Sequence, residues 1–67
     1  MELRWYEGQD RRNGERFWWT QRNKNGVCYE IRKVGVQFAL RKCGCLEGYH
    51  DSLQEAMDAA LMDFAMR

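Results

Sequence analysis

The sequence predicts an α+β domain in which an antiparallel three- to four-stranded β-meander is covered on one face by a single C-terminal α-helix. Two observations carry this prediction. The last third of the chain combines a helix-start signal with an apolar stripe at helical spacing, and the residues before it alternate between apolar and polar side chains. The length of 67 residues is enough for one small domain.

The helix is predicted over residues 52–66. Ser52 followed by Glu55 has the spacing of a capping box, in which each side chain satisfies the other residue's backbone N–H. The apolar stripe behind it follows the i, i+3, i+4, i+7 rule. Its members are Leu53, Ala56, Met57, Ala60, Leu61 and Phe64. Met62 and Met66 form a second stripe beside it, which either widens the core contact or makes a small dimer seam, so we expect a monomer or a weak homodimer.

The strands are predicted between strong turn signals. Asn13-Gly14 and Asn25-Gly26 are dipeptides typical of tight hairpin turns, because Asn and Gly tolerate positive φ. Gly35 separates two further alternating runs. The expected strands are residues 3–7, 15–22, 27–34 and 36–42, followed by a loop over 43–51.

Alternation assigns the side chains of each strand to a face. The predicted core under the helix consists of Trp5, Phe17, Trp19, Tyr29, Ile31, Phe38 and Leu40, with Leu3, Val27 and Val36 on the same side. Trp18 and Trp19 cannot both enter a one-sided core from a regular strand. Trp18 is therefore expected on the open face, the sheet face that the helix leaves uncovered.

The charge is divided unevenly along the chain. Residues 1–46 carry ten Lys or Arg against five Asp or Glu, whereas residues 47–67 carry one against five. The strand region is thus basic and the helix acidic, an asymmetry that bears on partners rather than on fold.

The open face is the first candidate site. Trp18, Arg32 and Arg41 are expected to bind a partner there, supported by Tyr6 and Arg22, with Arg4 and Arg16 nearby. Arg interleaved with aromatic residues suits an acidic protein surface, a phosphate or a stacked base. The ordinary alternative is a solvated face of an antiparallel sheet.

A second candidate surface is the acidic outer face of the helix. Glu55, Asp58 and Asp63 are expected to lie there, where they could dock on a basic protein or mimic nucleic-acid charge.

The three cysteines and the single histidine are the candidate metal-binding and catalytic residues of the chain. Cys28, Cys43, Cys45 and His50 could form a zinc site, but the Cys43-Gly44-Cys45 spacing is shorter than a zinc knuckle needs. A catalytic Cys–His pair lacks a third orienting group, and a chain this short leaves little room for a pocket of about 300 Å³. We therefore expect free thiols, no enzyme activity, no metal and no cofactor.

The chain carries no apolar run near the roughly 20 residues that span a membrane, and its start has no signal-peptide pattern. We expect a cytoplasmic protein that does not enter membranes.

The segment Leu46–Ala56 resembles a pattern found in short proteins of phages and mobile elements, where an aromatic residue precedes a Ser-Leu-x-Glu-Ala helix start. It looks like small phage proteins that inhibit CRISPR systems or host enzymes. It is also similar to the three-stranded DNA-binding arm modules of integrases, although those are far more basic. The resemblance implies an inhibitor or adaptor that binds a host protein or protein–nucleic acid complex. A nucleic-acid-binding module is the alternative.

Overall fold

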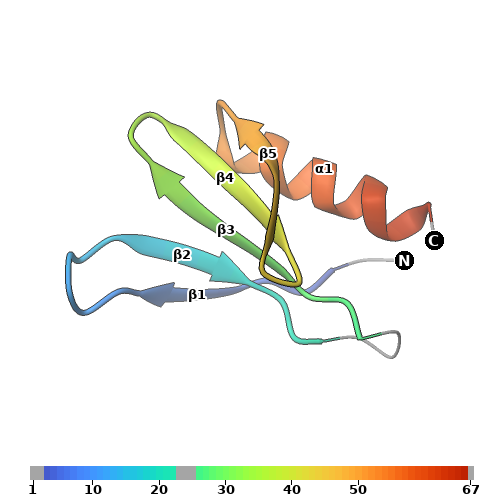
Figure 1. Cartoon of the computed structure of the whole chain (residues 1–67), viewed down its shortest axis with the longest axis horizontal. Coiled ribbons are helices and arrows are strands. Elements are labelled where there is room, and N and C mark those ends of the chain that lie inside the picture. Colours follow the sequence, from blue (N-terminus) through green and yellow to red (C-terminus); the bar gives the residue numbers. More distant parts are fainter. Residues whose placement is uncertain (1–2, 23–25, 67) are drawn as a thin grey trace.

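The computed structural model describes residues 3–22 and 26–66, and these form one antiparallel five-stranded sheet with a C-terminal helix (Figure 1). The strands are β1 (Tyr6–Gln9), β2 (Arg16–Trp19), β3 (Tyr29–Val34), β4 (Gln37–Lys42) and β5 (Cys45–His50), and the helix is α1 (Leu53–Ala65). Sequential strands are neighbours throughout, so the sheet order is β1-β2-β3-β4-β5. The α+β meander is confirmed, with one strand more than the sequence predicted.

The additional strand is β5, which lies where a loop was expected. It follows a two-residue turn at Cys43 and Gly44, whose φ angles of 52° and 85° are both positive. Positive φ at both central residues is the signature of a type I′ hairpin, but Cys in place of Asn or Asp hides it in the sequence. A β-bulge between Leu40 and Arg41 then shifts the register of β5 against β4.

The β1–β2 connection is longer than the Asn13-Gly14 dipeptide suggested. Only Gly14 of that pair has a positive φ, and the loop closes through hydrogen bonds from Asp10 N to the Glu15 carbonyl (2.8 Å) and from Gly14 N to the Asp10 carbonyl (2.8 Å). The Asn13 side chain also accepts a hydrogen bond from Glu15 N at 2.9 Å. Asn25 of the second predicted dipeptide lies outside the described residues.

The register of β2 reverses the predicted faces of its aromatic residues. Trp18 lies opposite Ile31 and packs against the core beside Phe38, with ring centroids 6.0 Å apart. Phe17 and Trp19 consequently point to the open face, and their predicted place in the core was wrong. Three consecutive aromatic residues carry no alternation of their own, so the cross-strand partner decides the face.

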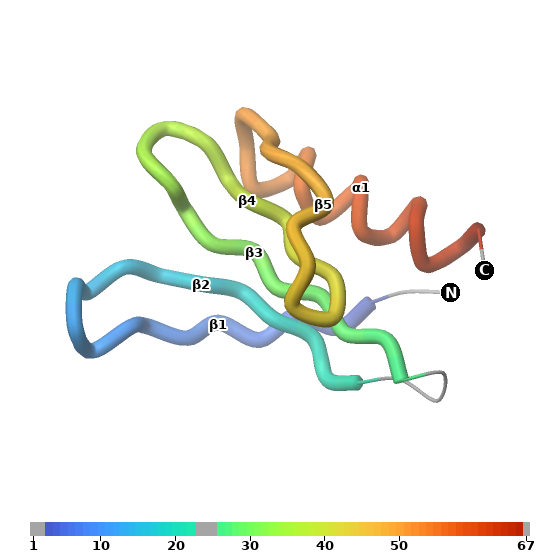
Figure 2. The backbone as a smooth tube through the Cα atoms, viewed as in Figure 1, coloured from blue at the N-terminus to red at the C-terminus, as the bar shows by residue number. Residues whose placement is uncertain are grey.

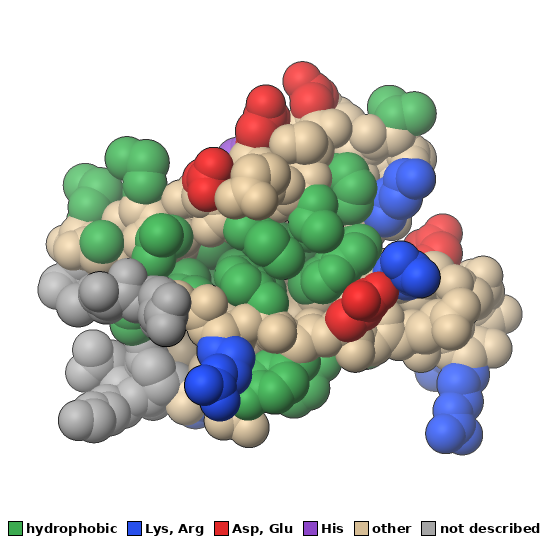
Figure 3. Space-filling model, turned by 180° about the vertical axis from the view of Figure 1, so that it is seen from behind, with side chains coloured by type: hydrophobic (Ala, Val, Ile, Leu, Met, Phe, Trp, Pro, Cys, Tyr) green, Lys and Arg blue, Asp and Glu red, His purple; other side chains and the backbone are tan. Residues whose placement is uncertain are grey.

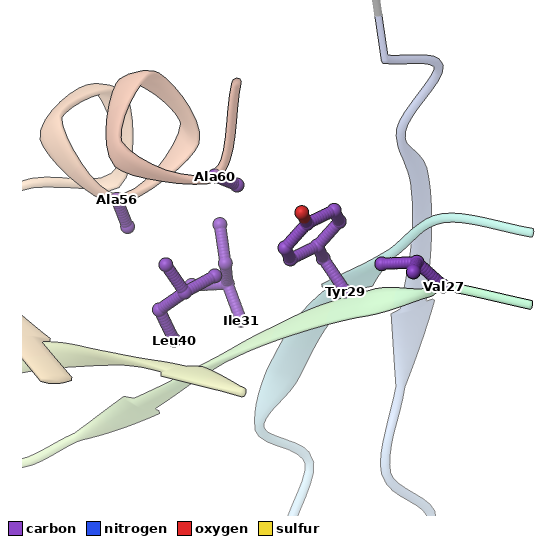
Figure 4. Close-up of a cluster of buried hydrophobic side chains, with 6 residues drawn as sticks. All are labelled: Val27, Tyr29, Ile31, Leu40, Ala56 and Ala60. Atoms are coloured by element: carbon purple, nitrogen blue, oxygen red, sulfur yellow. The ribbon is translucent and has the colours of Figure 1, made fainter. Parts of the chain in front are cut away.

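The core lies between α1 and the middle of the sheet (Figure 4). Ile31, Ala56 and Ala60 are fully buried, and Tyr29 and Leu40 are almost so. In the close-up, Ala56 and Ala60 lie on the side of the helix that faces the sheet, above Leu40, Ile31 and Tyr29. Alanine at these two positions lets the helix axis approach the sheet closely. Leu61 is only half-buried, and Val36, expected on the inner face, is 86% exposed in the β3–β4 turn.

Polar groups hold both ends of α1. Ser52 caps the helix by accepting a hydrogen bond from Glu55 N at 3.1 Å, which is one of the two hydrogen bonds of the predicted capping box. Near the other end, the Tyr29 hydroxyl donates to Asp63 Oδ2 at 2.6 Å, and Lys42 Nζ lies 2.9 Å from the same oxygen. Asp63 therefore points toward the sheet, with its side chain still 38% exposed, and does not lie on the outer face of the helix where it was predicted.

One helix covers only part of this sheet. The helix packs on β3, β4 and β5 and leaves β1 and β2 uncovered. Figure 2 shows the β1–β2 hairpin diverging from the β3–β4 hairpin toward their turns. Away from the turns, β2 pairs with β3 through only Phe17, Trp18 and Trp19. No helix within the described residues has the length and apolar character needed to cross a membrane.

The close seat of α1 predicts that Ala60→Leu is destabilising. The added side chain has no space against the sheet, and such overpacking costs about 1–3 kcal/mol. Ala65→Leu, on an exposed position of the same helix, is the matched control and should change stability by less than about 0.5 kcal/mol. Urea unfolding measures both variants. Equal unfolding midpoints would show that Ala60 does not set the distance between helix and sheet.

Candidate functional surface

The open face carries two rows of side chains that cross all five strands. Cross-strand partners share a face, and the register aligns the rows directly. The first row is Tyr6, Trp19, Glu30, Arg41 and Leu46; the second is Gly8, Phe17, Arg32, Ala39 and Tyr49. We call these ten positions the open-face surface. Six of the ten are aromatic residues or arginines, and together they come from all five strands: Tyr6, Phe17, Trp19, Arg32, Arg41 and Tyr49.

Aromatic packing organises the β1–β2 end of this surface. The rings of Tyr6 and Trp19 stack with centroids 4.9 Å apart and planes at 26°. Gly8 makes room for Phe17, because a Cβ on Gly8 would lie 2.6 Å from the tip of the Phe17 ring. The ring of Phe17 can therefore lie over β1.

Arg32 is neutralised within the fold. Its Nε donates to Glu30 Oε1 at 3.0 Å, and its Nη1 lies 3.5 Å from Asp10 Oδ2. The guanidinium also sits over Phe17, with Cζ 4.7 Å from the ring centroid. The hydrogen bond to Glu30 raises the pKa of Arg32 above its ordinary value, so this side chain stays charged. Its role is to order the surface.

Arg41 differs from Arg32, because it forms no ion pair within residues 3–22 and 26–66. It borders a hollow of about 520 Å³ whose walls include Phe17, Trp19 and Cys28. The hollow is larger than the chain length suggested. Its walls are mainly apolar, and Arg41 and Glu30 are the charged residues that border it.

The edge strand β5 extends the surface with exposed apolar groups. Leu46 is 49% exposed and Tyr49 is 52% exposed. These residues are three apart, so regular alternation would place them on opposite faces. The bulge in the β4–β5 pairing puts both on the open face, opposite Arg41 and Ala39.

The structure brings together three of the five residues predicted for partner binding. Tyr6, Arg32 and Arg41 share the open face, and Arg22 is exposed just beyond β2, beside a hollow that Tyr6 also lines. Trp18 lies on the opposite face, because it pairs with Ile31, which faces the helix.

Four side chains of this surface lie elsewhere than the sequence predicts, and Gly8 lies outside the predicted first strand. Trp19 and Phe17 were assigned to the core, and Leu46 and Tyr49 were assigned to a loop. No pattern in the sequence marks the bulge that orients the last two.

Two charged residues also lie elsewhere than predicted. Arg16 lies on the face of the sheet that the helix covers, where it pairs with Glu7 at 3.2 Å. Asp63 points from the helix toward the sheet, where it accepts the hydrogen bond from Tyr29. Of the second candidate surface, Glu55 and Asp58 remain exposed on α1.

The cysteines and His50 are not gathered into one site. Cys45 and His50 occupy the two ends of β5, which at about 3.4 Å per residue separates them by about 17 Å. Cys28 lies beside Cys43, whose N–H donates to the Cys28 carbonyl at 2.9 Å. No three His, Cys, Asp or Glu side chains among the described residues are close enough to hold a metal ion.

Comparison with known proteins adds no family: no protein-family model, no curated protein and no solved structure matches the chain.

The packing of Phe17 against Gly8 predicts a selective effect of adding one methyl group. In Gly8→Ala the Phe17 ring must move, and Arg32 loses its position over that ring. Gly48→Ala is the matched control, because a Cβ there meets nothing closer than 4.0 Å. NMR measures this through the side-chain protons of Arg32, which the ring current shifts upfield. We expect that upfield shift to shrink in Gly8→Ala and to persist in Gly48→Ala; an unchanged shift in both variants would contradict the packing.

Proposed function

We propose that this chain is a small, non-enzymatic binding protein, an inhibitor or adaptor of the phage type, that docks its open-face surface onto a protein of a host macromolecular machine in the cytoplasm. The observation that carries the proposal is the pair of side-chain rows that cross the whole sheet on a face with no helix over it. Tyr, Trp and Arg, the residue types that dominate interface hot spots, make up much of both rows.

The composition of this surface favours a protein partner. Leu46, Tyr49 and the walls of the hollow offer apolar area, whose burial drives association. Internal ion pairs already balance Arg32, which limits the net positive charge of the surface. Arg41 is left to donate hydrogen bonds to one acidic group of the partner, and such a charged contact fixes orientation more than it adds affinity.

A nucleic-acid ligand is the second candidate, and one observation favours it. Arg4, Arg22 and Arg41 form no ion pair within residues 3–22 and 26–66, and the stacked Tyr6 and Trp19 lie among them. Arginines beside exposed rings suit a phosphate backbone with stacked bases.

The test uses the tagged protein as bait in a lysate of cells that carry its gene. We expect a partner that is retained by the wild type and by Glu55→Lys on the helix, and that is lost with Arg41→Glu. With the partner purified, Arg41→Glu should weaken binding by about 2 kcal/mol or more, as loss of a hot spot does. Equal retention by Arg41→Glu and the wild type would exclude the open-face surface.

Salt dependence separates the two candidates. A labelled 30-base-pair duplex bound through three arginines should lose affinity about 40-fold between 50 and 200 mM salt, from a slope of about −0.9 per phosphate. Burial of apolar area on a protein partner responds far less to salt. A tight duplex complex with the steep slope, measured by fluorescence anisotropy, would establish the nucleic-acid alternative.

A further inference from the structure

The helix side of the sheet has an apolar furrow that the fold leaves open. It runs between α1 and the β1–β2 hairpin, and Figure 3 shows hydrophobic side chains gathered there in one continuous area below the acidic residues of the helix. We call this the helix-side furrow. It holds two hollows. The apolar walls of the hollow beside α1 are Leu3, Trp5, Met57 and Leu61. Those of the hollow at the hairpin tips are Trp18 and Phe38, beside the charged residues Glu15, Arg16 and Lys33.

The dimensions of the furrow match one α-helix. Neighbouring strands lie about 4.8 Å apart, so the two strands that α1 leaves uncovered, β1 and β2, offer a strip about 10 Å wide. A helix with its side chains is about 10–12 Å across. The furrow also deepens between the tips of the two hairpins, where a hollow of about 530 Å³ lies beside Trp18 and Phe38.

The rim of the furrow indicates the charge of the occupant. On the α1 side, Asp58 and Gln54 border the hollow that Trp5 and Met57 line, and Gln54 Nε2 donates to Asp58 Oδ1 at 2.9 Å. Asp58 meets no cation among the described residues. On the hairpin side, Glu7 is neutralised by Arg16 at 3.2 Å. At the hairpin tips, Glu15 and Lys33 line the larger hollow and offset each other in charge. The unbalanced charge of the rim is therefore the negative charge of Asp58, on the α1 side.

We propose that the helix-side furrow docks an amphipathic α-helix of a partner protein, with basic residues along the flank that meets α1. Helix-in-groove binding needs aromatic anchors and adaptable apolar walls, which Trp5, Trp18 and Met57 provide. The helix of a second copy is a poorer occupant, because it brings its own Glu55 and Asp58 toward the acidic rim. This surface is separate from the open-face surface, on the other side of the sheet.

Two synthetic 14-residue peptides test the proposal. Both carry the same Leu stripe at helical spacing, one with Lys and the other with Glu at the polar positions. We expect the Leu/Lys peptide to bind at least about fivefold more tightly by fluorescence anisotropy. In NMR titrations it should shift the amide signals of Trp5, Trp18 and Asp58, and leave those of Arg41 and Tyr49 unchanged.

A matched pair of variants tests the rim. Asp58→Lys should weaken binding of the Leu/Lys peptide about fivefold. Glu55→Lys should change it less than twofold, because Glu55 is also exposed but does not border the furrow. Both variants are checked for folding by circular dichroism.

Several outcomes overturn the proposal. They are equal binding of the two peptides, equal effects of the two variants, signals shifted only on the open face, and no shift at millimolar peptide. Sedimentation that shows a dimer, with the furrow signals shifting as protein concentration rises, would assign the furrow to a second copy instead.

Discussion

The register of β2 is the constraint on which the rest of the structure depends. The pairing of Trp18 with Ile31 places the Trp18 ring on the helix side of the sheet and turns Phe17 and Trp19 to the open face. A slip of one residue would exchange these faces. The aromatic stack with Tyr6, the position of Arg32 over Phe17 and the need for Gly8 all follow from this pairing.

The second constraint is that one helix is too narrow for five strands. Ala56 and Ala60 seat α1 on β3 to β5, and the contacts of Asp63 with Tyr29 and Lys42 hold it there. One face of the sheet is therefore not covered by the helix at all, and on the other face β1 and β2 are left uncovered. Apolar and aromatic side chains lie in both areas, which is why we propose two binding surfaces on so short a chain.

How far the sequence predicts this structure depends on whether local patterns decide each element. Strict alternation of Tyr29 with Ile31 and of Phe38 with Leu40 made β3 and β4 predictable, and Ser52 located the start of α1. In contrast, the faces of the Phe17-Trp18-Trp19 run depend on a partner strand. The bulge that hides β5 arises from pairing with β4 and has no local signal. Of the residues predicted for partner binding, Arg32 and Arg41 on the alternating strands β3 and β4, and Tyr6 on β1, lie on the open face.

The most direct test of this account is the proximity of the two tryptophan rings to their neighbours in solution, measured by nuclear Overhauser spectroscopy of the isotope-labelled protein. The register predicts cross-peaks from the Trp18 indole to Ile31 and Phe38, and from the Trp19 indole to Tyr6. Cross-peaks from Trp19 to Ile31 or Ala56, together with contacts between Trp18 and Tyr6, would show the opposite register and contradict both proposed surfaces.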